Sequence, residues 1–423
     1  MKLPAEIVDH IIDYLGSLNP KALSACSLVS SQWLRRCRYH LFSTVHLGPC
    51  RLPLFKNLLR SPSCTLTRYV SHIEIDGSSK PSNASAPTVS AIIESISIIQ
   101  HSRFSRITSV RLQNIDWTAL HFQEQTAIKR SLSRMTTLTR LEFHRIEFHD
   151  LREAARMLAS LPSVRHTTFS HILFTKYADQ AVAAAARLRL PTHLTSIELG
   201  PGDAVPSVLA CLATHSIHEA PCIRALSING LRRDDVAHLN SALSVIGPQL
   251  QQLKIAFWEG GTSENAGVPG APSGCIDLRT LENLRCLSLD LDDATHVDRT
   301  QGPVAALTSI LSTLSSSELQ SVDLVVRPSS TKAVACAEWR ELDVAISRKH
   351  ADCIQPVRLQ LVCDAIKGID ESVLQKTLEA RVREDMSSLD RRGKLRLACV
   401  FDPKTNQERA EWRRWVRTLA RRF

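Results

Sequence analysis

The sequence predicts a repeat-type α/β fold behind a small helical segment. A phrase of the form apolar-x-x-apolar-x-apolar returns along most of the chain, at a mean step of about 31 residues. Amphipathic helical patterns lie between successive copies of this phrase. One strand and one helix per step, stacked side by side, are typical of a right-handed horseshoe with a parallel inner sheet.

The N-terminal segment is predicted to form short helices. Pro4 is tolerated in a first helical turn, and Asn19 followed by Pro20 starts another helix. Apolar residues recur at helical spacing in two stripes: Ile7, Ile11, Ile12 and Leu15, then Leu23, Cys26, Val29 and Trp33. A unit this small cannot bury all of these side chains by itself, so some must face the rest of the chain or a partner.

The order Leu-Pro-x-Glu-Ile, a stripe ending in Tyr-Leu, then Ala-Cys-x-Leu-Val-Ser and a tryptophan resembles an F-box of the kind common in mushroom-forming fungi. The resemblance implies that this segment docks on a Skp-type adaptor and through it on a cullin. The adaptor-binding residues that it implies are Leu3, Pro4, Ile7, Ile11, Leu15, Leu23, Val29 and Trp33. The loop between the first two helices is shorter than in the family, and the match is looser after Trp33. The alternative is a helical cap that only shields the end of the next domain.

The repeat phrases predict the strands in order. They span Val70–Ile75, Ile107–Leu112, Leu138–Phe143, Val164–Phe169, Leu194–Leu199, Ile223–Ile228, Leu250–Ile255, Leu284–Leu289 and Leu319–Leu324, with a weaker copy at Val357–Leu361. The helical patterns between them include Ala91–Ile99, Leu151–Leu158, Ala181–Leu190, Val205–Ala213 and Val304–Leu314.

This part resembles an irregular leucine-rich repeat, as found behind many F-boxes. Where that family carries an inward asparagine, this chain has Ile115, Ile146, Ile172 and Leu231, so packing must stabilise those turns. The alternative is a doubly wound α/β enzyme. The near-even spacing of the phrase argues against that enzyme fold, as does the absence of a nucleotide-binding fingerprint.

Residues that alternate with the apolar strand positions are expected on the concave side of the sheet. The candidate substrate-binding residues on this side are Arg111, Arg140, Glu142, His144, His166, Glu198, Asn229, Lys254, Asp290 and Asp323. Their mixed charge suits a protein partner better than a nucleic-acid backbone. For any single residue, the alternative is the solvated face of an open sheet.

We expect a helical domain at 1–45, a solenoid at 46–380 and a basic capping segment at 381–423. Loops rich in small residues interrupt the solenoid at 77–90 and 259–274. The capping segment ends in an amphipathic helix with Trp412 and Trp415 on one face and arginines on the other. We interpret this helix as a cap for the repeat core, with a membrane-surface or nuclear-import segment as alternatives.

Composition and motifs exclude several classes of protein. The cysteines show no tight pairs, and no secretory signal accompanies them, which favours reduced thiols and a cytoplasmic or nuclear location. No apolar run has the length of a membrane span. We find no nucleophile elbow, His-Glu-x-x-His motif or Cys-x-x-Cys pair, so we expect no enzyme activity, metal or cofactor. The net charge of +10 lies mostly in the terminal segment, which argues against a nucleic-acid partner.

Together these patterns predict the substrate-recognition subunit of a Skp–cullin–F-box ubiquitin ligase. Its N-terminal helices would dock on the adaptor, and its solenoid would hold an unidentified target protein. The alternative is a repeat-protein interaction scaffold with no role in degradation.

Overall fold

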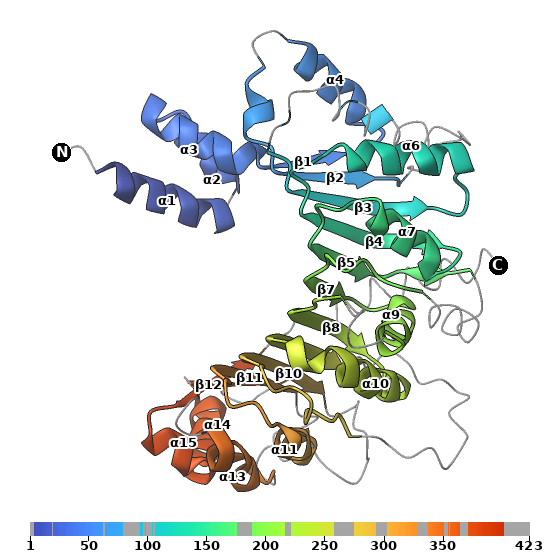
Figure 1. Cartoon of the computed structure of the whole chain (residues 1–423). Helices are drawn as coiled ribbons and strands as arrows, with labels where there is room; N and C mark the ends of the chain where they lie inside the picture. The colour runs from blue at the N-terminus through green and yellow to red at the C-terminus, as the bar shows by residue number, and fades with distance from the viewer. Residues whose placement is uncertain are drawn as a thin grey trace. The chain divides into compact units, whose positions relative to one another are not determined.

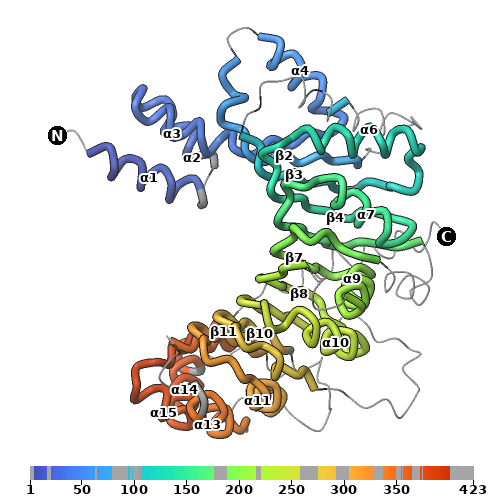
Figure 2. Tube along the Cα trace, in the orientation of Figure 1, coloured from blue at the N-terminus to red at the C-terminus, as the bar shows by residue number. Residues whose placement is uncertain are grey.

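The computed structural model describes residues 4–18, 20–61, 64–78, 94–95, 98, 104, 106–175, 188–215, 221–257, 275–292, 303–327, 337–350, 354, 356–363 and 371–401. The chain divides into two compact units. The first comprises Met1–Leu194 with Gly202–Ala204, and the second comprises Thr195–Pro201 with Val205–Phe423. Figure 1 shows strands and helices alternating along the chain, and Figure 2 follows the same path as a trace.

In the first unit, five strands pair in parallel in the order β1-β2-β3-β4-β5, and β6 pairs with β4. The strands are β1 (Thr44–Leu47), β2 (His72–Asp76), β3 (Ser109–Asp116), β4 (Arg140–Phe148), β5 (His166–Ser170) and β6 (Leu173–Phe174). The helices are α1 (Ala5–Leu18), α2 (Pro20–Cys26), α3 (Ser31–Phe42), α4 (Leu52–Arg60), the 3₁₀ turn η1 (Leu66–Arg68), α6 (Phe122–Ser133) and α7 (Leu151–Ala159).

In the second unit, seven strands follow one another in the order β7 to β13, again in parallel pairs. The strands are β7 (Ser196–Leu199), β8 (Ala225–Leu231), β9 (Gln252–Phe257), β10 (Cys286–Asp292), β11 (Ser321–Arg327), β12 (Val357–Cys363) and β13 (Leu395–Phe401). The helices are α9 (Ala204–Ala213), η2 (Arg233–Asp235), α10 (Val236–Ile246), η3 (Gly247–Gln249), α11 (Pro303–Thr313), α13 (Trp339–His350), α14 (Glu371–Asp385) and α15 (Ser387–Arg391).

The predicted α/β repeat fold with a parallel sheet is confirmed. Each of the ten repeat phrases overlaps a strand, β2 to β5 and β7 to β12. The structure adds β1, β6 and β13, which the sequence analysis missed, and β13 pairs with β12 inside the segment taken as a cap. The described predicted helices Leu151–Leu158, Val205–Ala213 and Val304–Leu314 correspond to α7, α9 and α11. The loops at 79–90 and 259–274, most of the patterns at 91–99 and 181–190, and the terminal helix with Trp412 and Trp415 lie outside the described residues.

Equivalent apolar residues of neighbouring strands lie in register, which builds the core in layers. In the first unit, Ile75, Leu112, Phe143 and Phe169 form one such row, and all four are buried. The rings of Phe143 and Phe169 stack with centroids 5.3 Å apart. Buried apolar residues of the helices face this layer, as in α7, where Leu151, Ala154, Ala155, Met157 and Leu158 are buried. Asp150 caps α7 by accepting a hydrogen bond from the Arg152 backbone N–H at 2.9 Å.

Three successive repeats share a left-handed backbone residue, within β3, within β4 and directly after β5. Asn114, Arg145 and His171 have φ values of 53°, 52° and 54°. In each case the next residue is an isoleucine, Ile115, Ile146 or Ile172, and all three isoleucines are buried. The left-handed residue shifts the alternation by one position, so that the isoleucine turns into the core. Packing at these turns is therefore confirmed.

A ladder of hydroxyl groups precedes the strands of the first unit. The carbonyl of Ser43 accepts the backbone N–H groups of Ser71 and His72, and the same pattern repeats from Ser71 and from Thr108 to the following strand. The side chains of Ser71 and Thr108 each donate to the carbonyl of the preceding member, at 3.3 Å. These hydrogen bonds satisfy backbone groups where the chain enters each strand.

Candidate functional site

The first candidate site is the three-helix bundle of α1, α2 and α3 (Figure 1). Its core consists of Val8, Ile12, Leu23 and Cys37, which are buried. Four further residues pack against this core while remaining partly exposed: Leu15, Cys26, Trp33 and Leu41. One side of α1 is thus buried in the core of the bundle.

A charged cluster joins α1 to α3 at the edge of this core. The Arg36 guanidinium donates to both carboxylate oxygens of Asp13, at 2.6 and 2.7 Å, and His40 Nε2 lies 2.7 Å from Asp13 Oδ1. The hydrogen bond from Arg36 holds the pKa of Asp13 well below its usual value, with His40 contributing in the same direction. Gly16 allows this close approach, because a Cβ atom there would lie 2.8 Å from His40 Nδ1.

The other side of α1 presents apolar side chains outward. Ile7, Ile11 and Tyr14 are 47%, 38% and 68% exposed. Their i, i+4, i+7 spacing places them on one helix face. Leu28 and Val29, in the turn between α2 and α3, are also exposed. We call Ile7, Ile11, Tyr14, Leu28 and Val29 the outward apolar set.

Of the residues that the sequence assigned to adaptor binding, some are exposed and others belong to the bundle core or pack against it. Pro4, Ile7, Ile11 and Val29 are exposed, whereas Leu23 is buried in the bundle core. Leu15 and Trp33 pack against that core, and Leu3 lies outside the described residues. The expected single stripe of Ile7, Ile11, Ile12 and Leu15 is wrong, because Val8 and Ile12 point inward while Ile7 and Ile11 point outward. Sequence analysis missed Tyr14 and Leu28 as exposed residues.

The second candidate site is the open face of the sheet, meaning the strand residues that alternate with the buried ones. In the first unit, strand register places Glu74, Arg111, Glu142 and Thr168 in one row. Arg111 and Arg140 each lie 2.7 Å from a carboxylate oxygen of Glu142, which is only 9% exposed. His46 lies 2.8 Å from Glu74 in the same row. Neighbouring strands thus compensate one another's charges on this face.

Two histidines lie close together at this sheet, His144 within β4 and His171 directly after β5. The rings of His144 and His171 meet edge to face, with centroids 5.3 Å apart. Burial lowers the pKa of each imidazole to about 4, and the nearby Arg145 acts in the same direction. His166 is more exposed, and burial lowers its pKa as well. The predicted site residues did not include His171. Its position is equivalent to that of Arg145 in the preceding repeat, and this equivalence could have identified it from the sequence.

The open face of the second unit carries its charges in another row. Glu198, Ser227, Lys254, Ser288, Asp323, Arg358 and Arg396 follow one another in register. Asp323 lies 3.7 Å from Arg358, and Asp290 lies 3.0 Å from Arg327. Asn229 donates to Glu198 over a long 3.5 Å. Lys254 is exposed. The predicted residues thus lie in several rows. In the first unit, Arg111 and Glu142 share one row, and Arg140 and His166 share another. In the second unit, Glu198, Lys254 and Asp323 lie in one row, and Asn229 and Asp290 both lie in register with Ala256.

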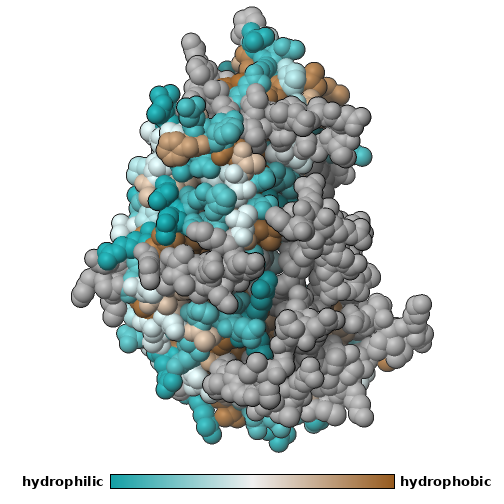
Figure 3. Space-filling view, turned by 90° about the vertical axis from the view of Figure 1, so that its right-hand side faces the viewer, coloured by the Kyte–Doolittle hydropathy of each residue, from teal (hydrophilic) through white to brown (hydrophobic). Residues whose placement is uncertain are grey.

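Among the described residues, no group of three or more His, Cys, Asp or Glu side chains is arranged to hold a metal ion. Each described cysteine is a free thiol, and burial raises the pKa of Cys399 to about 12. Among the described helices, none combines the length and the apolar character needed to cross a bilayer. The surface in Figure 3 is mainly hydrophilic where it is described, with small separate hydrophobic areas.

Comparisons with known proteins give distant structural likenesses. No family model matches the chain, and no curated protein matches it. Among solved structures, the leucine-rich repeat-containing protein LegL7 from Legionella pneumophila has a TM-score of 0.45 at 15% identity, covering 81% of this chain and 98% of that one. The structure of the Rad7 and Elc1 complex in yeast has a TM-score of 0.40 at 12% identity, covering 89% of this chain and 84% of that one.

Proposed function

We propose that this protein is a non-enzymatic substrate receptor of a Skp–cullin–F-box ubiquitin ligase in the cytoplasm or nucleus. The observation that carries the proposal is the outward apolar set on a bundle whose core is already filled by other residues. A helix that is apolar on two faces and covered on one is suited to dock a partner with the other. The F-box-like sequence of the same segment supports a Skp-type adaptor as this partner.

The open face of the sheet is the proposed surface for a target protein. Its paired charges in both units give a mixed, polar surface, which is suited to specificity rather than to tight hydrophobic burial. A receptor of this kind accelerates ubiquitin transfer by positioning the target near the conjugating enzyme. The alternative, a scaffold without a degradative role, would use the same surfaces.

The test is retention of a purified Skp-type adaptor by the full-length chain. We expect the wild type to retain the adaptor and the double variant Ile7→Asp/Ile11→Asp to lose it, because both changes place a charge on the docking face. Leu54→Asp is the matched control, since Leu54 is an exposed leucine of α4 outside the bundle. Circular dichroism of each variant checks that the helices still form.

Equal retention by wild type and the double variant would contradict docking through α1. No retention by the wild type would leave the bundle as a cap and the chain as a free-standing scaffold. If the adaptor does bind, the turnover of candidate targets in cells expressing wild type or the double variant separates the ligase receptor from the scaffold. A scaffold leaves target half-lives unchanged.

A further inference from the structure

A hollow lined by arginines lies between α3 and the segments that lead into the first strands. Its volume is about 560 Å³. From α3 come Ser31, Arg35 and Arg38, which share one helix face by their i, i+4, i+7 spacing. Arg68 and Tyr69 come from the end of η1, and Arg106 comes from the segment before β3.

The charges around this hollow are one-sided. Among the described residues that line it, four are arginines and none is acidic. Arg36, on the same helix, is paired with Asp13 in the bundle, but Arg35, Arg38, Arg68 and Arg106 form no ion pair with any residue that the structure describes. Four arginines around one hollow give it a positive potential that attracts an anion.

We propose that this hollow binds a ligand carrying two neighbouring phosphate groups. A phosphate monoester carries a charge of about −1.5 to −2 at neutral pH, so two of them balance four arginines. Guanidinium groups bind phosphate oxygens in a bidentate manner, and the hydroxyls of Ser31 and Tyr69 are further donors at the rim. A volume of this size falls in the range of small-ligand sites, roughly 300–1,000 Å³.

The geometry argues against a nucleic-acid strand as the ligand. Binding to a strand needs a basic track with several aromatic rings on which bases stack. Here the arginines converge on one hollow, and Tyr69 is the single aromatic residue among its described lining. The phosphates can instead come from a small free molecule or from a doubly phosphorylated protein segment, which share the same chemistry.

The bound anion would join the helical bundle to the start of the sheet. Two of the arginines belong to α3, and the other two precede β2 and β3. A ligand that bridges them binds only the folded arrangement, so it raises the thermal midpoint of the chain by mass action. The proposal does not depend on adaptor docking, because none of these residues belongs to the outward apolar set.

The experiment is calorimetric titration of the full-length chain with three probes: pyrophosphate, a peptide with two adjacent phosphoserines, and inorganic phosphate. We expect pyrophosphate or the peptide to bind at least about tenfold more tightly than inorganic phosphate, and more weakly at higher salt. Whichever of the two binds more tightly identifies the source of the phosphates. The double variant Arg35→Gln/Arg106→Gln should weaken binding at least about tenfold, since each change removes a charge-assisted contact.

Arg130→Gln is the control, because Arg130 is an exposed arginine of α6 outside the hollow. Unchanged binding by the double variant, or an equal loss in the Arg130 variant, would overturn the proposal. So would equal affinity for all three probes, or no binding by the wild type. The thermal midpoints without ligand check that both variants fold. Ile7→Asp/Ile11→Asp should still bind pyrophosphate, which separates a failure here from a failure of adaptor docking.

Discussion

At the scale of single residues, the surroundings of His144 and His171 lower the pKa values of both imidazoles. Both imidazoles are largely buried beside Arg145, and their pKa values fall from 6.5 to about 4. They are therefore neutral at neutral pH and can pack edge to face without mutual repulsion. His171 also holds one of the left-handed backbone positions, at φ 54°. A non-glycine residue there is strained by roughly 1 kcal/mol or more, which its neighbours must offset.

These lowered pKa values predict a loss of stability in mild acid. Below about pH 6.5 the unfolded histidines bind protons while the folded ones do not until about pH 4, so acidification over this window lowers the free energy of the unfolded state relative to the folded state. Between pH 7 and pH 5 we expect a loss on the order of 1 kcal/mol for each histidine. The measurement is the urea midpoint of wild type and of His144→Gln/His171→Gln at both pH values. The double variant should lose less stability on acidification, and parallel losses would contradict the assignment.

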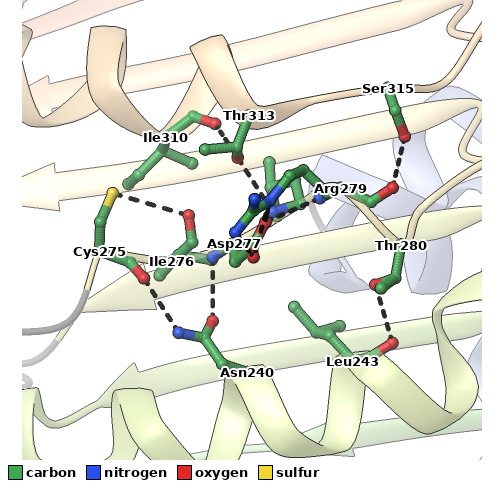
Figure 4. A network of polar contacts seen from close by, with 11 residues as sticks. Asn240, Leu243, Cys275, Ile276, Asp277, Arg279, Thr280, Ile310, Thr313 and Ser315 are labelled. Carbon is green, nitrogen blue, oxygen red and sulfur yellow. Dashed lines mark hydrogen bonds and ion pairs between the residues drawn. The ribbon is translucent and has the colours of Figure 1, made fainter.

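At the scale of elements, the described part of the segment that leads from β9 to β10 is irregular, and side chains of the neighbouring helices hold it in place. Figure 4 shows this segment held between α10 and α11 by polar contacts. The amide of Asn240 donates to the Cys275 carbonyl and accepts from the Asp277 backbone N–H, both at 2.9 Å. On the other side, Thr313 Oγ1 accepts from the Leu278 backbone N–H at 3.0 Å. Side chains of two helices thus satisfy the backbone of the segment between them.

Removing the Asn240 amide tests this arrangement. Asn240→Ala leaves the Cys275 carbonyl and the Asp277 N–H without their side-chain partner, and we expect a loss of about 1–3 kcal/mol. The readout is amide hydrogen exchange, which should accelerate in residues 275–283. Ser244→Ala on the same helix is the control, because the Ser244 hydroxyl bonds only to the Ser241 carbonyl, at 2.7 Å, on an exposed surface. Similar exchange in both variants would show that the segment does not depend on Asn240.

The strands were predictable wherever the repeat phrase was complete. β1 carries only the second half of the phrase, as Val45-x-Leu47, and β13 was hidden by its basic surroundings despite the alternation of Leu395, Leu397 and Cys399. The site was less predictable. α1 is apolar on two faces, so its periodicity could not decide whether Ile7 or Val8 points into the bundle. That choice depends on α2 and α3, which supply the rest of the core.

At the scale of the whole molecule, each unit is built from contacts between successive strands. β4, for example, pairs with β3 on one side and with β5 and β6 on the other. In such an array, stability is approximately a sum of repeat terms and nearest-neighbour terms. A substitution that destabilises one repeat should therefore also lower the stability of its neighbours, and this effect should decrease with distance along the strand order.

Phe143→Ala tests this expectation, since Phe143 is fully buried and packs against Phe148 and Phe169. Removing the ring should cost about 3–5 kcal/mol. We expect amide exchange to accelerate most in β3, β4 and β5, while β9, β10 and β11 keep their protection. Phe122→Ala, at an exposed phenylalanine of α6, is the control and should change little. Equal acceleration in every strand would instead mean that the chain unfolds as one cooperative body, because the loss at one repeat would then reach all of them.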